Sequence, residues 1–114
     1  MNELKTIINA IKDKLGENIV VLDIKKVSTI SEYFIIASAD NERKVSAIAK
    51  NVEDEMKNIS HFASSKEGYD TQKWIVLDYG ECIVHIFKNE ERDFYDLERL
   101  WKDAPYIDID TILA

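Results

Sequence analysis

The side chains best suited to metal or nucleophilic chemistry are the single cysteine, Cys82, and two histidines, His61 and His85. A metal site would need ligands at two- or four-residue spacing, and these three do not provide it. Cys82 and His85 are three residues apart in an apolar run, so a strand would point them to opposite faces. This spacing also argues against a Cys–His nucleophile pair. We expect Cys82 to be a small buried hydrophobe with little thiolate.

Phosphate and magnesium chemistry have equally little support. The three glycines are isolated at positions 16, 68 and 80, so the chain has no glycine-rich phosphate loop. A nucleotidyltransferase would combine a Gly-Ser turn with an Asp-x-Asp pair that holds Mg²⁺. Here the corresponding turn reads Ser38-Ala39-Asp40, and the one Asp-x-Asp pair, Asp108 and Asp110, lies in the C-terminal tail. We expect no catalytic residue, metal or cofactor, and keep a degenerate or active metal-dependent nucleotidyltransferase as the alternative.

Composition describes a small acidic domain. The 114 residues are 46% hydrophobic and 32% charged, which is typical of one globular domain. A net charge of −7 argues against broad binding to a nucleic-acid backbone, which needs clustered cations. One cysteine suits a reducing cytosol, and neither a membrane-spanning run nor a signal peptide is recognisable. We therefore predict a cytoplasmic protein that does not interact with membranes.

The acidic residues concentrate near the C-terminus. Residues 78–114 hold 10 acidic and 4 basic residues, whereas the rest of the chain is nearly neutral. This segment is either a docking face for a basic partner or an ordinary solvated surface. Six aromatic residues lie at 74–101, and Trp and Tyr are common anchors at interfaces. We expect Phe87, Phe94 and Trp101 to fill the core, and leave open whether the other three, Trp74, Tyr79 and Tyr95, are core or interface.

Hydrophobic periodicity shows which elements must position these side chains. Apolar spacing predicts helices over residues 3–15 and after a cap at Asp40 or Asn41. β-Branched and aromatic runs predict strands at 19–24 and 33–37, and a hairpin of 74–77 and 82–87 that turns at Gly80. Residues 60–72 are expected to form a loop or a weak edge strand.

The C-terminal part is predicted to form one more helix. Asp93 is expected to cap it, with Phe94, Leu97 and Trp101 on one stripe, and Pro105 is expected to end it. We therefore predict an α/β (α+β) fold with a single mixed sheet flanked by helices, as one domain over residues 1–105. Residues 106–114 are a tail that either docks or frays.

Three segments resemble the Iojap family, the bacterial ribosomal silencing factors. They are SEYFIIASA at 31–39, WIVLDYGECIVHIF at 74–87 and RDFYDLERLW at 92–101, and the resemblance covers about residues 3–105. It implies a nucleotidyltransferase-like fold without catalytic residues, and no enzymatic activity. It also implies a translational repressor that binds the large ribosomal subunit at its fourteenth protein and sterically blocks joining of the small subunit, and it allows a homodimer.

The resemblance carries partner-binding roles onto matching positions of this chain. Acids such as Asp78 and Glu98 would pair with cations of a basic ribosomal protein, without sequence-specific contact to nucleic acid. Glu32 stands where the family usually has Asp, and Ser38-Ala39-Asp40 replaces the usual Thr-Gly. A third interpretation is an acidic adaptor with a non-ribosomal partner. The partner-binding residues that we predict are Trp74, Asp78, Tyr79, Glu81, Arg92, Tyr95 and Glu98.

Overall fold

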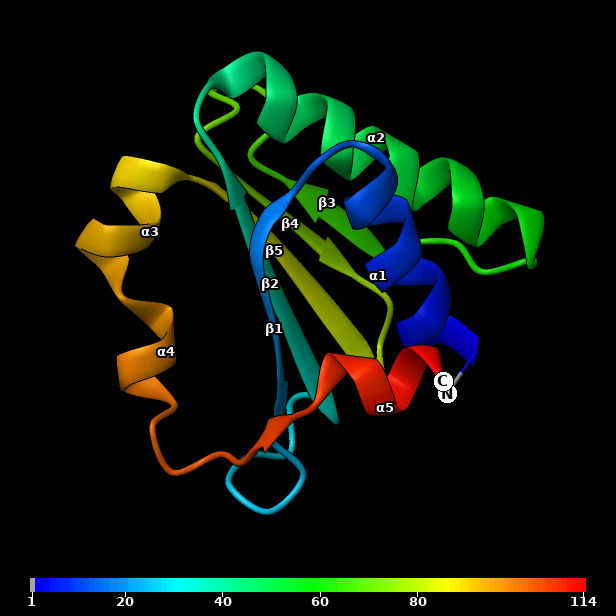
Figure 1. The fold of residues 1–114 in the computed structure, drawn as a ribbon, viewed down its shortest axis with the longest axis vertical. Helices are drawn as coiled ribbons and strands as arrows, with labels where there is room; N and C mark the ends of the chain where they lie inside the picture. The colour runs from blue at the N-terminus through cyan, green and yellow to red at the C-terminus, as the bar shows by residue number, and fades with distance from the viewer. Residues whose placement is uncertain (1) are drawn as a thin grey trace.

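A six-stranded mixed sheet forms the centre of the protein, with helices on both of its faces (Figure 1). The computed structural model describes residues 2–114. The strands are β1 (Glu17–Asp23), β2 (Tyr33–Ala39), β3 (Ser65–Glu67), β4 (Trp74–Asp78), β5 (Cys82–Lys88) and β6 (Tyr106–Ile107). The helices are α1 (Asn2–Asp13), α2 (Glu42–Asn58), α3 (Asn89–Tyr95), α4 (Leu97–Leu100) and α5 (Ile109–Leu113).

The strand order, β3-β4-β5-β2-β1-β6, places the parallel pair β2 and β5 at the centre. The other neighbouring strands pair antiparallel. The chain passes through α2, β3 and β4 between β2 and β5, which confirms the predicted parallel crossover and mixed sheet. β3 is a short, exposed strand at the sheet edge, as residues 60–72 suggested.

Helices α1, α2 and α5 lie on one face of the sheet, and α3 and α4 lie on the other (Figure 1). Helix α2 begins after Asn41, whose side chain accepts a hydrogen bond from the Lys44 backbone N–H. This capping bond satisfies one of the free donors of the first turn. Both long helices bury most of the predicted apolar stripe, from Leu4 to Ile11 in α1 and from Val45 to Met56 in α2. The last predicted member of each stripe, Leu15 and Ile59, lies beyond the end of its helix and is exposed, so that part of the prediction is wrong.

Strand β5 alternates between the two cores, as its sequence predicted. Cys82, Val84 and Ile86 pack in the core under α1 and α2, whereas Phe87 packs on the α3–α4 side. Burial raises the pKa of the Cys82 thiol to about 12, so the thiolate form is suppressed. The prediction that Cys82 is a buried hydrophobe is therefore confirmed.

The last predicted helix differs in its start and in its continuity. It begins directly after β5 at Asn89, so the prediction that Asp93 caps it is wrong. The chain then breaks at Asp96, which adopts a left-handed conformation (φ 49°), and α4 follows. Leu97 is buried and Trp101 packs beside it. Phe94 is 81% exposed, so its assignment to the core is wrong: the break at Asp96 separates it from the stripe of Leu97 and Trp101.

The C-terminal tail docks on the domain. β6 pairs with β1 at the sheet edge, and α5 follows with its N-terminus capped by the Asp108 side chain. Ile112 of α5 is buried in the core with α1. No helix within residues 2–114 has the length and apolar character needed to cross a membrane.

Candidate partner-binding surface

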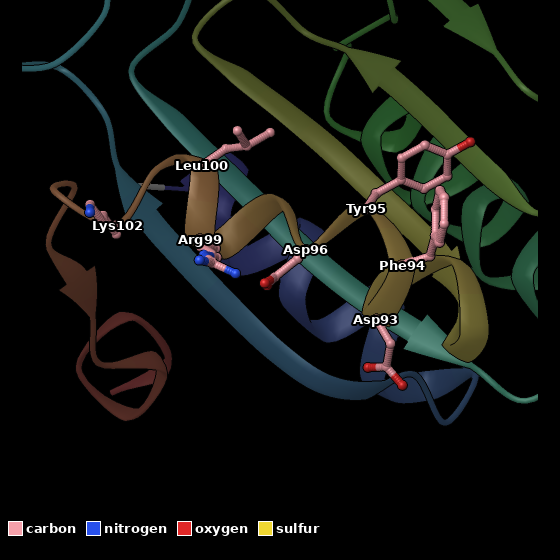
Figure 2. Close-up of a pocket in the computed structure, with 7 residues that line it drawn as sticks. All are labelled: Asp93, Phe94, Tyr95, Asp96, Arg99, Leu100 and Lys102. Atoms are coloured by element: carbon pink, nitrogen blue, oxygen red, sulfur yellow. The ribbon is translucent and has the colours of Figure 1, made fainter.

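An open groove of about 570 Å³ lies along α3 and α4 (Figure 2). We call it the α3–α4 groove. Residues of α3 and α4 lie on either side of the backbone break at Asp96, and the chain after α4 completes the lining. The lining residues are Asp93, Phe94, Tyr95, Asp96, Arg99, Leu100 and Lys102.

The groove gathers three exposed apolar side chains. Phe94 is 81% exposed, Leu100 75% and Tyr95 47%. The rings of Phe94 and Tyr95 meet edge to face, with centroids 5.1 Å apart. Clustered apolar exposure of this kind marks interaction sites more often than single exposed hydrophobes do.

Trp74 supports the groove from the sheet. Its half-buried ring stacks on Phe87 with a centroid distance of 4.7 Å and contacts the Tyr95 ring at 4.8 Å. The indole Nε1–H donates to His85 Nδ1 at 3.2 Å, which fixes the ring orientation. The structure therefore brings together two predicted site residues, Trp74 and Tyr95, and both are of a type common at binding hot spots.

His85 is buried beneath the groove and supports the Trp74 ring. Burial lowers its pKa to about 4, so the imidazole is neutral near pH 7 and accepts at Nδ1. Within residues 2–114 its Nε2 has no hydrogen-bond partner. The same part of the chain holds no group of three His, Cys, Asp or Glu side chains that could bind a metal ion.

Both charge signs are present in the groove. Asp93 and Asp96 contribute carboxylates, and Arg99 and Lys102 contribute cations. The acidic excess of residues 78–114 therefore does not gather in this groove. A partner would meet apolar side chains interspersed with charges of both signs, which favours orientation over unspecific attraction.

Arg92 and Glu98 pair with each other. Arg92 is 8% exposed, and its Nε and Nη2 donate to Glu98 Oε2 at 3.2 and 3.0 Å. Its Nη1 donates to Ser38 Oγ at 3.1 Å and to the Glu17 carbonyl oxygen at 3.4 Å. Both residues were predicted to contact a partner, yet their charged groups bond to each other, with Arg92 buried and Glu98 partly buried.

The remaining predicted site residues lie at the opposite end of β4 from Trp74, in the turn to β5. Asp78 Oδ1 accepts from the Gly80 N–H at 2.8 Å, and Gly80 has the left-handed φ of 84° expected at this turn. Tyr79 is half-buried on the α2 side, where burial raises its pKa to about 12. Glu81 is exposed. The seven predicted residues thus form three groups and not one site.

Sequence reasoning missed the apolar lining of the groove, Phe94 and Leu100. Their exposure follows from the break at Asp96, and no Gly or Pro marks a break at that point. Asp tolerates the left-handed conformation better than most residues, which is a weak signal in advance of a structure.

A family model described as "Ribosomal silencing factor during starvation" matches residues 1–114. The chain belongs to this family. The ribosomal silencing factor RsfS of Bacillus subtilis is 36% identical over 107 residues, which cover 94% of this chain and 91% of that protein. The resemblance found in the sequence is thereby confirmed. The family name places the chain in translation regulation, and this relative is named a silencing factor and not an enzyme.

Other similarities agree with the fold. The crystal structure of a protein from Chromobacterium violaceum superposes with a TM-score of 0.86 at 32% identity, over 89% of this chain and 84% of that chain. A more distant relative of this ribosomal silencing factor family is the mouse protein "Mitochondrial assembly of ribosomal large subunit protein 1". It is 22% identical over 102 residues, which cover 87% of this chain and 45% of that protein.

Proposed function

We propose that this chain is a cytoplasmic, non-enzymatic translational repressor that binds the large ribosomal subunit through its fourteenth protein and blocks joining of the small subunit. The observation that carries the proposal is the exposed α3–α4 groove, on a chain matched over its whole length by the ribosomal silencing factor family. The name of the mouse relative, which refers to assembly of the large ribosomal subunit, supports the choice of subunit.

The groove has the residue types that a protein interface needs. Phe94, Tyr95 and Leu100 supply apolar anchors, and Trp74 holds Tyr95 in place from the sheet. The net charge of −7 disfavours the ribosomal RNA backbone and favours a basic ribosomal protein as the contact. Within the groove, partner binding is thus assigned to Tyr95, with Trp74 behind it, and Phe94 and Leu100 are added.

The acidic residues of the β4–β5 turn would contribute to binding in a different way from the groove residues. Asp78 and Glu81 lie apart from the groove, so they would act through long-range attraction to a basic surface and raise the association rate. Repression itself needs no chemistry. A body of 34 × 33 × 26 Å bound to the joining face would exclude the small subunit by its volume.

The groove is tested by co-sedimentation of the purified chain with isolated large subunits. We expect Phe94→Ala and Tyr95→Ala each to weaken binding by about thirtyfold, because a buried aromatic anchor contributes about 2 kcal/mol or more. Phe62→Ala is the matched control, since Phe62 is 67% exposed in the loop after α2 and does not line the groove. We expect it to bind like the unaltered chain.

The same sedimentation experiment also measures repression of subunit joining. Adding the chain to separated subunits should reduce the fraction of joined ribosomes, and Phe94→Ala should restore it. Migration of the unaltered chain with neither subunit at near-physiological salt contradicts the proposed function. Equal binding by the Phe94 and Phe62 variants would remove the groove from the interface.

A further inference from the structure

Arg92 and Glu98 stand on either side of the break that separates α3 from α4. Arg92 lies in α3 and Glu98 in α4, and both Arg92–Glu98 hydrogen bonds end on the same carboxylate oxygen, Oε2. Between them the Asp96 N–H donates to the Arg92 carbonyl oxygen at 2.9 Å. The ion pair therefore closes a small loop around the only residue of this segment with positive φ.

The same guanidinium ties α3 to the sheet. Its Nη1 reaches Ser38 Oγ at the end of β2 and the Glu17 carbonyl oxygen at the start of β1. A planar guanidinium can donate in several fixed directions at once, which a lysine ammonium cannot match. One side chain thus connects α3, α4 and the two strands β1 and β2.

We propose that Arg92 and Glu98 are a clamp that positions the two walls of the α3–α4 groove, and that neither charge contacts the partner. This inference rests on the proposed function of the groove. The neighbours of the two clamp residues line the groove: Asp93, Phe94 and Tyr95 follow Arg92, and Arg99 and Leu100 follow Glu98. A change in the angle at Asp96 would separate these walls and displace Tyr95 from Trp74.

Burial makes the clamp sensitive to the loss of either partner. The Arg92 side chain is 9% exposed and that of Glu98 23%, so the Nε and Nη2 donors of Arg92 depend on Glu98 Oε2 more than on water. Loss of the Glu98 acceptor leaves the Nε and Nη2 donors of Arg92 without their hydrogen-bond partner, which costs more at a buried side chain than at an exposed one. The groove therefore keeps its shape only while both members are present.

The decisive comparison is Glu98→Gln with Glu98→Ala. The amide oxygen of Gln can still accept from Nε and Nη2, whereas Ala removes both hydrogen bonds. We expect Glu98→Gln to bind the large subunit within about threefold of the unaltered chain, and Glu98→Ala to bind about tenfold or more weakly. A carboxylate that contacts a basic partner gives another pattern, in which both variants lose affinity equally and the salt dependence decreases.

A second readout needs no ribosome. The Trp74–Tyr95 contact at 4.8 Å should contribute to the near-ultraviolet circular dichroism of the isolated chain. We expect Glu98→Gln to retain this signal, and Glu98→Ala and Arg92→Met to reduce it with unchanged far-ultraviolet spectra. The Tyr95→Phe variant shows which part of the near-ultraviolet signal comes from Tyr95. Glu67→Gln is a control that removes an exposed carboxylate from the edge strand β3.

The clamp proposal is wrong if Glu98→Gln and Glu98→Ala lose affinity equally. It is also wrong if Glu98→Ala keeps both the affinity and the spectrum of the unaltered chain. If the unaltered chain does not bind the large subunit, the proposed function fails, while the spectra still decide whether Arg92 and Glu98 position Tyr95. Binding measurements are made below the unfolding temperature of every variant, so that a loss of affinity is not a loss of fold.

Discussion

At the scale of single residues, the imidazole of His85 is a buried polar group beneath the groove. It is 6% exposed and lies among aromatic rings, 4.8 Å from Phe34 between centroids, with Trp74 as its hydrogen-bond donor. A protonated imidazole could not accept this bond and would be a buried charge. The neutral form is therefore the one that the fold selects.

The stability of the fold should consequently decrease in mild acid. Because the pKa of His85 falls from 6.5 to about 4 on folding, the unfolded chain binds more protons between these values. His85 stabilises the fold fully above pH 6.5, and this contribution is lost as the pH falls toward 4. At about 1.4 kcal/mol per pH unit, the loss approaches about 3 kcal/mol.

Urea unfolding at pH 7, 5.5 and 4 measures this dependence. His85→Gln keeps an acceptor for Trp74 but does not titrate, so its free energy of unfolding should fall less steeply over this range. His61→Gln is the matched control at the other, exposed histidine and should follow the unaltered chain. If His85→Gln and the unaltered chain lose stability in parallel, the buried imidazole is not the cause.

At the scale of elements, two turns of the β3–β4–β5 meander place a glycine at positive φ, for different reasons. Gly68 has φ 94° and Gly80 has φ 84°. An added Cβ at Gly68 would lie 1.9 Å from the Trp74 carbonyl oxygen, whereas at Gly80 nothing lies within 4 Å. Gly80 supplies only a backbone conformation, whereas Gly68 also allows the close approach of two strands.

Alanine at these two positions should therefore have unequal effects. Gly80→Ala should cost about 1 kcal/mol for the left-handed conformation alone. Gly68→Ala should cost about 3 kcal/mol or more, because the backbone at Trp74 must move as well. Chemical denaturation of both variants under one condition makes the comparison, and equal costs would show that the contact at Trp74 is readily relieved.

At the scale of the whole molecule, the sheet is completed by the C-terminal residues. β6 covers the edge of β1, and α5 packs on the same core as α1. Residues 106–114, first considered as a tail, thus contribute both hydrogen bonds and apolar packing. The N-terminal and C-terminal helices lie side by side in this arrangement (Figure 1).

Ile112 should carry much of that contribution. It is 7% exposed, and Ile112→Ala should cost about 2 kcal/mol through lost burial and a residual cavity. Tyr106→Ala is the control on β6, since Tyr106 is 57% exposed, and it should cost less than about 0.5 kcal/mol. Thermal unfolding of the two variants tests this, and equal midpoints would mean that α5 docks without stabilising the core.

The sequence predicted the elements whose signals are local and failed where geometry depends on packing. A cap at Asp40 or Asn41, the stripes of α1 and α2 and the alternation of β5 were predicted from the sequence. The structure selects Asn41 as the cap and confirms the stripes as far as Ile11 and Met56 and the alternation. The start of α3 and the exposure of Phe94 were predicted wrongly. The helical stripe assumed an unbroken helix, whereas Asp96 breaks it and the Arg92–Glu98 pair spans the break.

The sequence by itself determined the class of the domain, the mixed sheet, the family and the absence of an exposed reactive thiol. These follow from periodicity, from three motifs in order and from one cysteine in an apolar strand. Only the tertiary structure decided which of the candidate residues are exposed and which are buried. The motifs show only that Arg92, Glu98, Trp74 and Tyr95 occur in the same sequence pattern. Which of them meet each other and which meet solvent depends on the angle of α3 and α4 over the sheet, and long-range packing sets that angle.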